Sequence, residues 1–141
     1  SVKAFVDALA QLDWAEAKNI RIDYRFAAGN PILFETYAAE LVRLSPDAIL
    51  AGEMPALAAL RRQTRIIPIV FVLVADPVGL GFVQSLARPS GNLTGFSAFD
   101  PPIMGKWLQL LKEVAPPVNR VAVIFNPDTA PYASLAGQPD D

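Results

Sequence analysis

An unbroken apolar run over residues 69–75 constrains the fold more than any other segment, and it stops at Asp76-Pro77. The run is rich in valine, it shows no polar alternation, and a turn signal follows it directly. Such a run predicts a strand buried on both faces, as in the middle of a parallel sheet. Ligands of open parallel sheets gather where strands end, so Asp76 stands where binding chemistry is usually found.

The composition predicts one packed domain and excludes several classes of partner. Of the 141 residues, 52% are hydrophobic and only 18% are charged, which favours a core over disorder. The net charge of -2, without a basic cluster, gives no footprint for nucleic acid or for an anionic membrane. With no Cys and no His, thiolate and imidazole metal ligands and Ser-His or Cys-His nucleophile pairs are absent, so carboxylates are the main catalytic option left.

Helical and strand patterns alternate along the rest of the chain. Helical spacing of apolar residues predicts helices near residues 2–13, 33–44, 55–65, 82–86 and 103–114. Strands are predicted at residues 19–26, with one wet face at a sheet edge, and at 47–51, 67–75, 93–98 and 120–125. This alternation predicts an α/β fold, a parallel sheet with helices on both faces.

The sequence shows no pattern of a membrane span, of a targeting peptide or of a nucleotide-binding loop. No apolar stretch approaches the ~20 residues that span a bilayer, and the longest, residues 66–75, is interrupted by Pro68. The chain starts at Ser1 on a helical pattern, so we expect that any targeting peptide was removed or not included. Gly79-Leu80-Gly81 lacks the third glycine of a dinucleotide fingerprint, and we expect neither a nucleotide nor another cofactor.

A series of short segments, in order along nearly the whole chain, carries a family resemblance. The segments are Asp13-Trp14 with Asn19-Ile20-Arg21-Ile22, Ala38-Ala39-Glu40-Leu41-Val42, Pro55-Ala56-Leu57-Ala58-Ala59-Leu60, Ile67-Pro68-Ile69-Val70-Phe71, Asp76-Pro77-Val78, Ser85-Leu86-Ala87-Arg88-Pro89 and Gly105-Lys106-Trp107-Leu108-Gln109-Leu110-Leu111-Lys112-Glu113. Their series resembles the substrate-binding proteins of bacterial ABC importers, in the subgroup similar to tryptophan- and tyrosine-type uptake receptors.

The resemblance implies two α/β lobes joined by a hinge that close on a small ligand, here as an incomplete lobe like that of a type I periplasmic binding protein. Residues 1–99 would form most of the first lobe, without its first strand. Residues 100–141 would form the hinge and the start of the second lobe, with a frayed tail. Asp13 and Ala17 stand where the family tends to have Gly, which takes left-handed geometry at little cost.

The turn at residues 52–57 is the first candidate for a ligand site. It runs from Gly52 through Met54 into a helix start, where unpaired N–H groups at Ala56 and Leu57 would hold a ligand carboxylate. The alternative is an ordinary strand-to-helix turn. Met54 stands where the family commonly has a small hydroxyl residue, and Glu53 adds a negative charge beside it.

Asp76 is the second candidate, because its carboxylate would accept a hydrogen bond from a ligand ammonium group. The alternative is a helix N-cap with Pro77 at the first helical position, and the two roles can coexist. Phe99, beside the Pro-rich joint, and Asn126, at the end of the last predicted strand, are further ligand-binding candidates. Trp107 is expected in the core, given its helical spacing.

We therefore expect a fragment of a solute-binding component of an ABC importer. The longer parent would be periplasmic, capture an amino acid or other small carboxylate, and present it to a membrane permease. The first alternative is a small α/β enzyme that uses Asp76, Glu53 or Asp100 as acid or base, and the second is a ligand-free structural domain. The missing interior strand would leave unpaired sheet edges, so we also expect self-association, with residues 121–125 as the nearest strand to pair.

Overall fold

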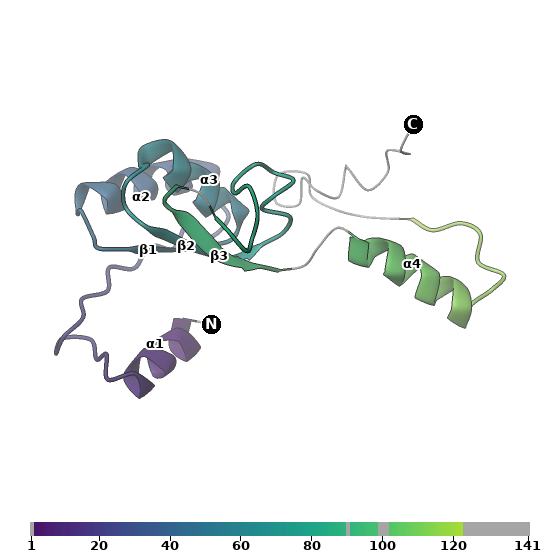
Figure 1. Ribbon diagram of the computed structural model, residues 1–141, viewed down its shortest axis with the longest axis horizontal. Coiled ribbons are helices and arrows are strands. Elements are labelled where there is room, and N and C mark those ends of the chain that lie inside the picture. The colour runs from purple at the N-terminus through teal and green to yellow at the C-terminus, as the bar shows by residue number, and fades with distance from the viewer. Residues whose placement is uncertain (1, 90, 99–101, 123–141) are drawn as a thin grey trace.

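Three parallel strands form the sheet of this computed structural model, which describes residues 2–89, 91–98 and 102–122. The strands are β1 (Ile49–Gly52), β2 (Ile69–Val74) and β3 (Leu93–Ser97), in the order β1-β2-β3 (Figure 1). Ile49 stands opposite Ile69, which in turn stands opposite Leu93. The predicted α/β class with a parallel sheet is confirmed, as are the predicted strands at 47–51, 67–75 and 93–98, each within two residues at either end.

Four helices accompany the sheet: α1 (Val2–Gln11), α2 (Pro31–Arg43), α3 (Met54–Gln63) and α4 (Pro102–Val114). The start of α2 is fixed by Asn30, whose side chain accepts hydrogen bonds from the N–H groups of Ile32 and Leu33. Helices α2 and α3 pack against each other, and α3 also packs on β1 and β2 (Figure 1). All four helices match predicted ones.

The core lies between α3 and one face of the sheet. Ile69, Phe71 and Val74 of β2 are almost fully buried there, together with Leu57 of α3 and Leu93 of β3. Ile69 and Phe71 share a face because alternate side chains of a strand point to opposite faces. Val74 is out of that phase and follows the register shift between Phe71 and Val74.

The expectation that the central strand is buried on both faces is wrong at Leu73, which is 68% exposed. The register between β2 and β3 shifts between Phe71 and Val74, and Leu73 itself has a left-handed φ of 59°. This irregularity turns the Leu73 side chain out of the packed layer.

The strand predicted at residues 19–26 is not formed. The segment shows only one isolated bridge, between Glu16 and Ile20, and residues 21–27 have no regular structure. Local contacts hold its beginning, because the Asn19 side chain donates to the Asp13 carbonyl oxygen and accepts from the Ala15 N–H. Alternating side chains favour a strand, but a strand also needs a hydrogen-bonding neighbour, and among the described residues this segment has none in the sheet.

The helix predicted at residues 82–86 is also wrong. The chain makes one tight turn after Asp76, in which the N–H groups of Phe82 and Val83 both donate to the Pro77 carbonyl oxygen. Gly81 then takes a left-handed φ of 69°, which ends the turn before a second helical turn can form. The turn nevertheless contributes to the core, since Val83 is buried.

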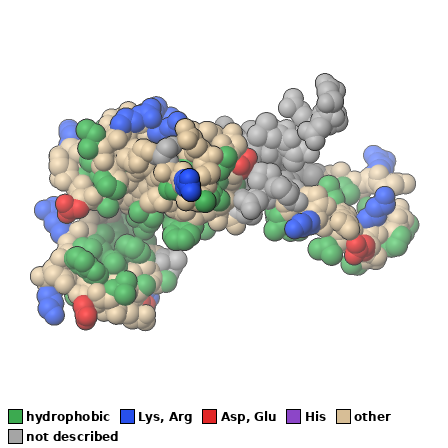
Figure 2. All heavy atoms as spheres, in the orientation of Figure 1, with side chains coloured by type: hydrophobic (Ala, Val, Ile, Leu, Met, Phe, Trp, Pro, Cys, Tyr) green, Lys and Arg blue, Asp and Glu red, His purple; other side chains and the backbone are tan. Residues whose placement is uncertain are grey.

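Apolar side chains are exposed along α1 and α4, as the hydrophobic colouring of Figure 2 shows for both ends of the molecule. Trp107 of α4 is half exposed, so the prediction that it belongs to the core is wrong for the described part of the chain. Of the strand predicted at 120–125, residues 120–122 show no regular structure and 123–125 lie outside the described residues. None of the described helices has the length and apolarity that crossing a membrane requires.

Candidate functional site

The carboxyl ends of β1 and β2 lie side by side and form one edge of the sheet. Gly52, the last residue of β1, stands opposite Val72, and the Glu53 N–H donates to the Val72 carbonyl oxygen at 3.0 Å. Helix α3 begins immediately afterwards at Met54, with Pro55 in its first turn. β2 continues past Val72 to Ala75 and Asp76. The predicted order of strand, Gly turn and Pro-started helix is therefore present. The two candidate ligand contacts, the turn at residues 52–57 and Asp76, both lie at this edge.

The start of α3 has one available amide of the two that were expected. Within the described residues the Ala56 N–H donates no hydrogen bond, whereas the Leu57 N–H donates to the Glu53 carbonyl oxygen at 3.3 Å. Glu53 is the N-cap residue, and its side chain makes no capping hydrogen bond. The unpaired amide and the positive end of the helix dipole favour an anion here. Leu57 itself serves the core, since its side chain is fully buried.

Gly52 leaves the edge sterically open. A Cβ atom at this position would meet nothing within 4 Å, and the residue does not have a left-handed φ. Neither packing nor backbone geometry among the described residues therefore requires glycine at this point. What the glycine provides is an unobstructed approach to the backbone. The side chains of the neighbouring Met54 and Ala56 are partly buried against the core.

Asp76 caps the turn that follows β2. Its Oδ1 accepts a hydrogen bond from the Gly79 N–H at 2.9 Å, and its backbone oxygen accepts from the Leu80 N–H at 3.0 Å. The side chain therefore caps a single turn, and the helix that the N-cap interpretation requires does not follow it. The side chain is only partly buried, and a carboxylate that has accepted one hydrogen bond retains lone pairs for another donor. The ligand-binding role therefore stays a prediction.

Backbone strain gathers at this same edge. Three non-glycine residues have left-handed φ values: Glu53 at 75°, Leu73 at 59° and Asp76 at 44°. Such conformations cost an L-residue roughly 1–2 kcal/mol each and persist where the surrounding structure determines them. Residues with such backbone conformations cluster at active sites and ligand-binding sites.

The structure does not describe the remaining candidates for the ligand site. Phe99 and Asn126 lie outside the described residues, as does Asp100. In the described part of the chain no group of His, Cys, Asp and Glu side chains is placed to hold a metal ion.

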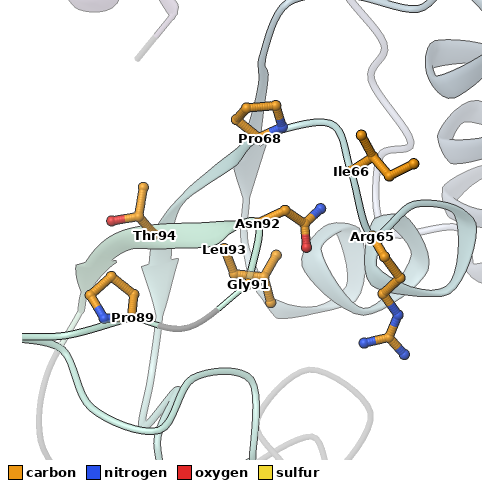
Figure 3. Close-up of a pocket in the computed structure, with 8 residues that line it drawn as sticks. All are labelled: Arg65, Ile66, Pro68, Pro89, Gly91, Asn92, Leu93 and Thr94. Atoms are coloured by element: carbon orange, nitrogen blue, oxygen red, sulfur yellow. The ribbon is translucent and has the colours of Figure 1, made fainter.

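Sequence reasoning missed an open hollow of about 370 Å³ at the opposite end of the strands, where β2 and β3 begin (Figure 3). Its lining residues are Arg65, Ile66, Pro68, Pro89, Gly91, Asn92, Leu93 and Thr94. A cation followed by two isoleucines and a proline, at residues 65–68, is the sequence signal that marks it. The hollow is far from the edge that carries Ala56 and Asp76, so it is not the predicted ligand site.

Comparisons with known proteins identify relatives of the whole chain. A family model described as "ABC transporter substrate binding protein" matches residues 1–136. The "Tyrosine-binding protein" of Clostridioides difficile (strain R20291) is 34% identical over 124 residues, which cover 88% of this chain and 35% of that protein.

Two solved structures are similar in fold as well as in sequence. A conserved domain protein from Vibrio cholerae O1 biovar El Tor str. N16961 superposes with a TM-score of 0.84 and 36% identity, over 94% of this chain and 44% of that one. An ABC domain from Streptococcus pneumonia, solved in complex with L-Trp, superposes with a TM-score of 0.71 and 27% identity, over 81% of this chain and 38% of that one. The chain thus spans between a third and a half of the length of these relatives.

Proposed function

Because the chain belongs to the family of ABC transporter substrate-binding proteins, we propose that it supplies one wall of a cleft that captures an amino acid or other small carboxylate. The observation that carries the proposal is the shared edge of β1 and β2. At that edge the unpaired Ala56 amide and the Asp76 carboxylate follow adjacent parallel strands.

The chemistry of this edge suits a zwitterion. The start of α3 favours a ligand carboxylate through the Ala56 N–H and the helix dipole. Asp76 favours a ligand ammonium group, and its partly buried position strengthens that attraction relative to bulk water. Glu53 adds a second negative charge at the mouth and disfavours ligands that carry two carboxylates. An amino acid with one carboxylate and one ammonium group satisfies all three features.

Aromatic amino acids are the first ligands to test. The Streptococcus relative was solved with L-Trp, and the Clostridioides relative is named for tyrosine binding. Those names describe the relatives, and their bearing on this chain rests on 27% and 34% identity. We propose the aromatic class and leave the choice between the two amino acids to measurement.

We propose that residues 1–99 form most of one lobe and that residues 100–141 begin the second, with α4 as its first described helix. Phe99 and Asn126 would then face the ligand from the hinge and from the second lobe. The longer protein would act outside the cytoplasmic membrane and deliver its ligand to an ABC permease. In this role Asp76 binds the ligand and Glu53 selects against a second carboxylate, without the acid–base catalysis of the enzyme alternative.

The test is an NMR titration of the ¹⁵N-labelled 141-residue chain, because chemical shifts report weak binding and also its location. L-Tryptophan is compared with indole-3-propionate, which keeps the ring and the carboxylate but lacks the ammonium group. We expect both ligands to shift the amides of residues 52–57, and L-tryptophan alone to shift those of residues 76–79. The Asp76→Asn chain should lose most of the preference for L-tryptophan, because a hydrogen bond to a charged group contributes about 1–3 kcal/mol.

The melting temperature of the same Asp76→Asn chain separates the capping role of Asp76 from its ligand role. Asn at position 76 can still accept the Gly79 N–H through its amide oxygen, so the melting temperature should change little. Shifts confined to other parts of the chain, or an undiminished preference for L-tryptophan in Asp76→Asn, would place the ligand elsewhere. A large drop in melting temperature with unchanged preference would reduce Asp76 to a cap.

A further inference from the structure

The loop between α3 and β2 is held rigidly by two side chains. Thr64 is buried, and its Oγ1 accepts hydrogen bonds from the N–H groups of Ile66 and Ile67, both at 3.2 Å. From the other side, Asn92 Nδ2 donates to the Ile67 carbonyl oxygen at 2.7 Å. Pro68 then restricts the backbone where the loop joins β2. Together these contacts fix the backbone from which the Arg65 and Ile66 side chains project.

The rigid loop exposes Ile66 to water beside Arg65, a cation that has no partner within residues 2–89, 91–98 and 102–122. Ile66 is 88% exposed, the highest exposed fraction of any large hydrophobic side chain in the described part of the chain. The Arg65 guanidinium makes no hydrogen bond or ion pair to any described residue. Its two neighbours on α3 are engaged, since Arg61 donates to the Gly81 carbonyl oxygen and Arg62 pairs with Glu35.

The open hollow adjoins this loop and offers apolar and polar surface together. In Figure 3, Asn92 and Leu93 lie in the middle, with Arg65 and Ile66 on one side and Pro89 and Thr94 on the other. None of the described residues that line it is acidic. On a molecule with a net charge of -2, this is a local basic and apolar surface, which we call the 65–68 surface after its loop.

We propose that the 65–68 surface docks a segment of a protein partner that carries a carboxylate next to a large apolar side chain. The carboxylate pairs with Arg65 in a bidentate contact, and the apolar side chain covers Ile66 and the two prolines. Charge complementarity favours an acidic partner, because among the described residues the surface has a cation without a partner and no anion. A rigid loop lowers the ordering cost of binding.

The shape of the hollow favours a protein segment over a small molecule. Small-ligand sites usually bury most of the ligand, whereas this hollow is open and its isoleucine rim projects into solvent. Its position has a consequence for the proposed function. The hollow lies where β2 and β3 begin, whereas the amino-acid site lies where β1 and β2 end, so a partner and an amino acid can be bound at the same time.

The experiment is selection of phage-displayed random dodecapeptides on the 141-residue chain, with counter-selection on the Arg65→Glu chain. We expect the peptides that survive to combine Asp or Glu with a nearby Leu, Ile, Phe or Trp. A synthetic copy of a selected peptide should lose about tenfold or more in affinity for Arg65→Glu and for Ile66→Ser, the usual scale for a charge-assisted contact. It should bind Lys112→Glu, the same charge change on α4, as tightly as the unchanged chain.

Shift mapping with the synthetic peptide gives the location, and the expected amides are residues 64–68 and 91–94. Melting temperatures of the variants control for folding, and Arg65→Lys, which keeps the charge but not the fork, should retain part of the affinity. The proposal is overturned if counter-selection leaves no binders, if the survivors lack acidic residues, or if the peptide shifts other amides. It is equally overturned if sodium hexanoate shifts residues 64–68 and 91–94 while the peptides do not, since the hollow would then be a small-carboxylate site.

Discussion

Seven non-glycine residues in the described part of the chain adopt left-handed backbone geometry, in two groups that lie in different places. Asp13, Ala17, Ala28 and Ser45 lie in turns and loops that connect the elements, whereas Glu53, Leu73 and Asp76 lie at the proposed ligand edge. Asp13 and Ala17 both have φ of 63°, which is the geometry that makes glycine favourable at the corresponding family positions. The chain keeps the turn conformation without the residue that adopts it most easily.

Ser45 is the clearest test of this strain, because it directly follows α2 and precedes β1 in the packed part of the molecule. Its φ is 49°, and its N–H donates to the Val42 carbonyl oxygen at 3.0 Å, the arrangement in which glycine usually ends a helix. Ser45→Gly should raise the free energy of unfolding by about 0.5–1 kcal/mol, measured by urea denaturation. Ala39→Gly, inside α2, should lower it by a similar amount. Equal destabilisation by both variants would show that position 45 carries no strain.

Gly79 tests how tightly Asp76 is held. A Cβ atom at residue 79 would overlap the Asp76 carboxylate, so Gly79→Ala should displace that side chain and break its hydrogen bond to the residue 79 N–H. We expect a loss of about 1–3 kcal/mol in the free energy of unfolding and loss of the L-tryptophan response at residues 76–79. Gly52→Ala is the matched control for stability, since its Cβ would enter open space. A Gly79→Ala chain as stable as Gly52→Ala would mean that the Asp76 turn can rearrange freely.

The helices and strands that depend on the local sequence pattern were predicted correctly. The four helices follow from apolar spacing and from breakers such as Ser45-Pro46, and β2 follows from its apolar run. The strand at 19–26 and the helix at 82–86 were wrong for different reasons. A strand exists only with a neighbour, which no alternation of side chains can supply. The one turn that forms after Asp76 precedes the predicted helix and ends at the left-handed Gly81, and residues 82–86 show only bends.

The candidate site was predictable to the same extent. Asp76 and the turn at 52–57 follow from strand ends and helix starts, and both lie at one edge as expected. Which amide is available depends on the first residue of α3. The helix begins at Met54, one residue earlier than predicted, so the Leu57 N–H already makes the first helical hydrogen bond, to the Glu53 carbonyl oxygen. The 65–68 surface was missed because the contacts of Thr64 and Asn92 that build it join residues up to 25 positions apart.

Strand β1 carries a prediction of its own, because it pairs only with β2 in the described structure. Its four residues include no charge and no proline that would discourage pairing with another chain, and Leu50 on its open face is 46% exposed. We expect the 141-residue chain to form oligomers, measured by light scattering, and Leu50→Lys to shift it toward monomer. Leu44→Lys, at a residue of matched exposure beyond the end of α2, should leave association unchanged. A monodisperse monomer at high concentration would contradict the expectation.

The packed core is formed within this chain, whereas the proposed cleft is not complete in it. The core joins α2, α3 and the three strands, and it does not need a ligand to bury its apolar residues. The proposed cleft, in contrast, has one described wall: an unpaired amide and a carboxylate at an open edge. Relatives of this fold are more than twice as long as the chain, so a second wall in them has room to come from residues that this chain does not match.

The last prediction follows from that single wall. Small ligands bind tightly largely because their surface is buried in the site. An amino acid at an open edge stays mostly hydrated, so little of its surface is buried and the affinity is low. We expect the 141-residue chain to bind L-tryptophan or L-tyrosine with a Kd of about 1 mM or weaker, a binding free energy of about -4 kcal/mol or less favourable. Isothermal titration calorimetry measures the affinity, and the NMR titration confirms that the weak binding is at residues 52–57 and 76–79. Micromolar affinity at that edge would mean that 141 residues enclose the ligand by themselves, and the two-lobe proposal would then have to be abandoned.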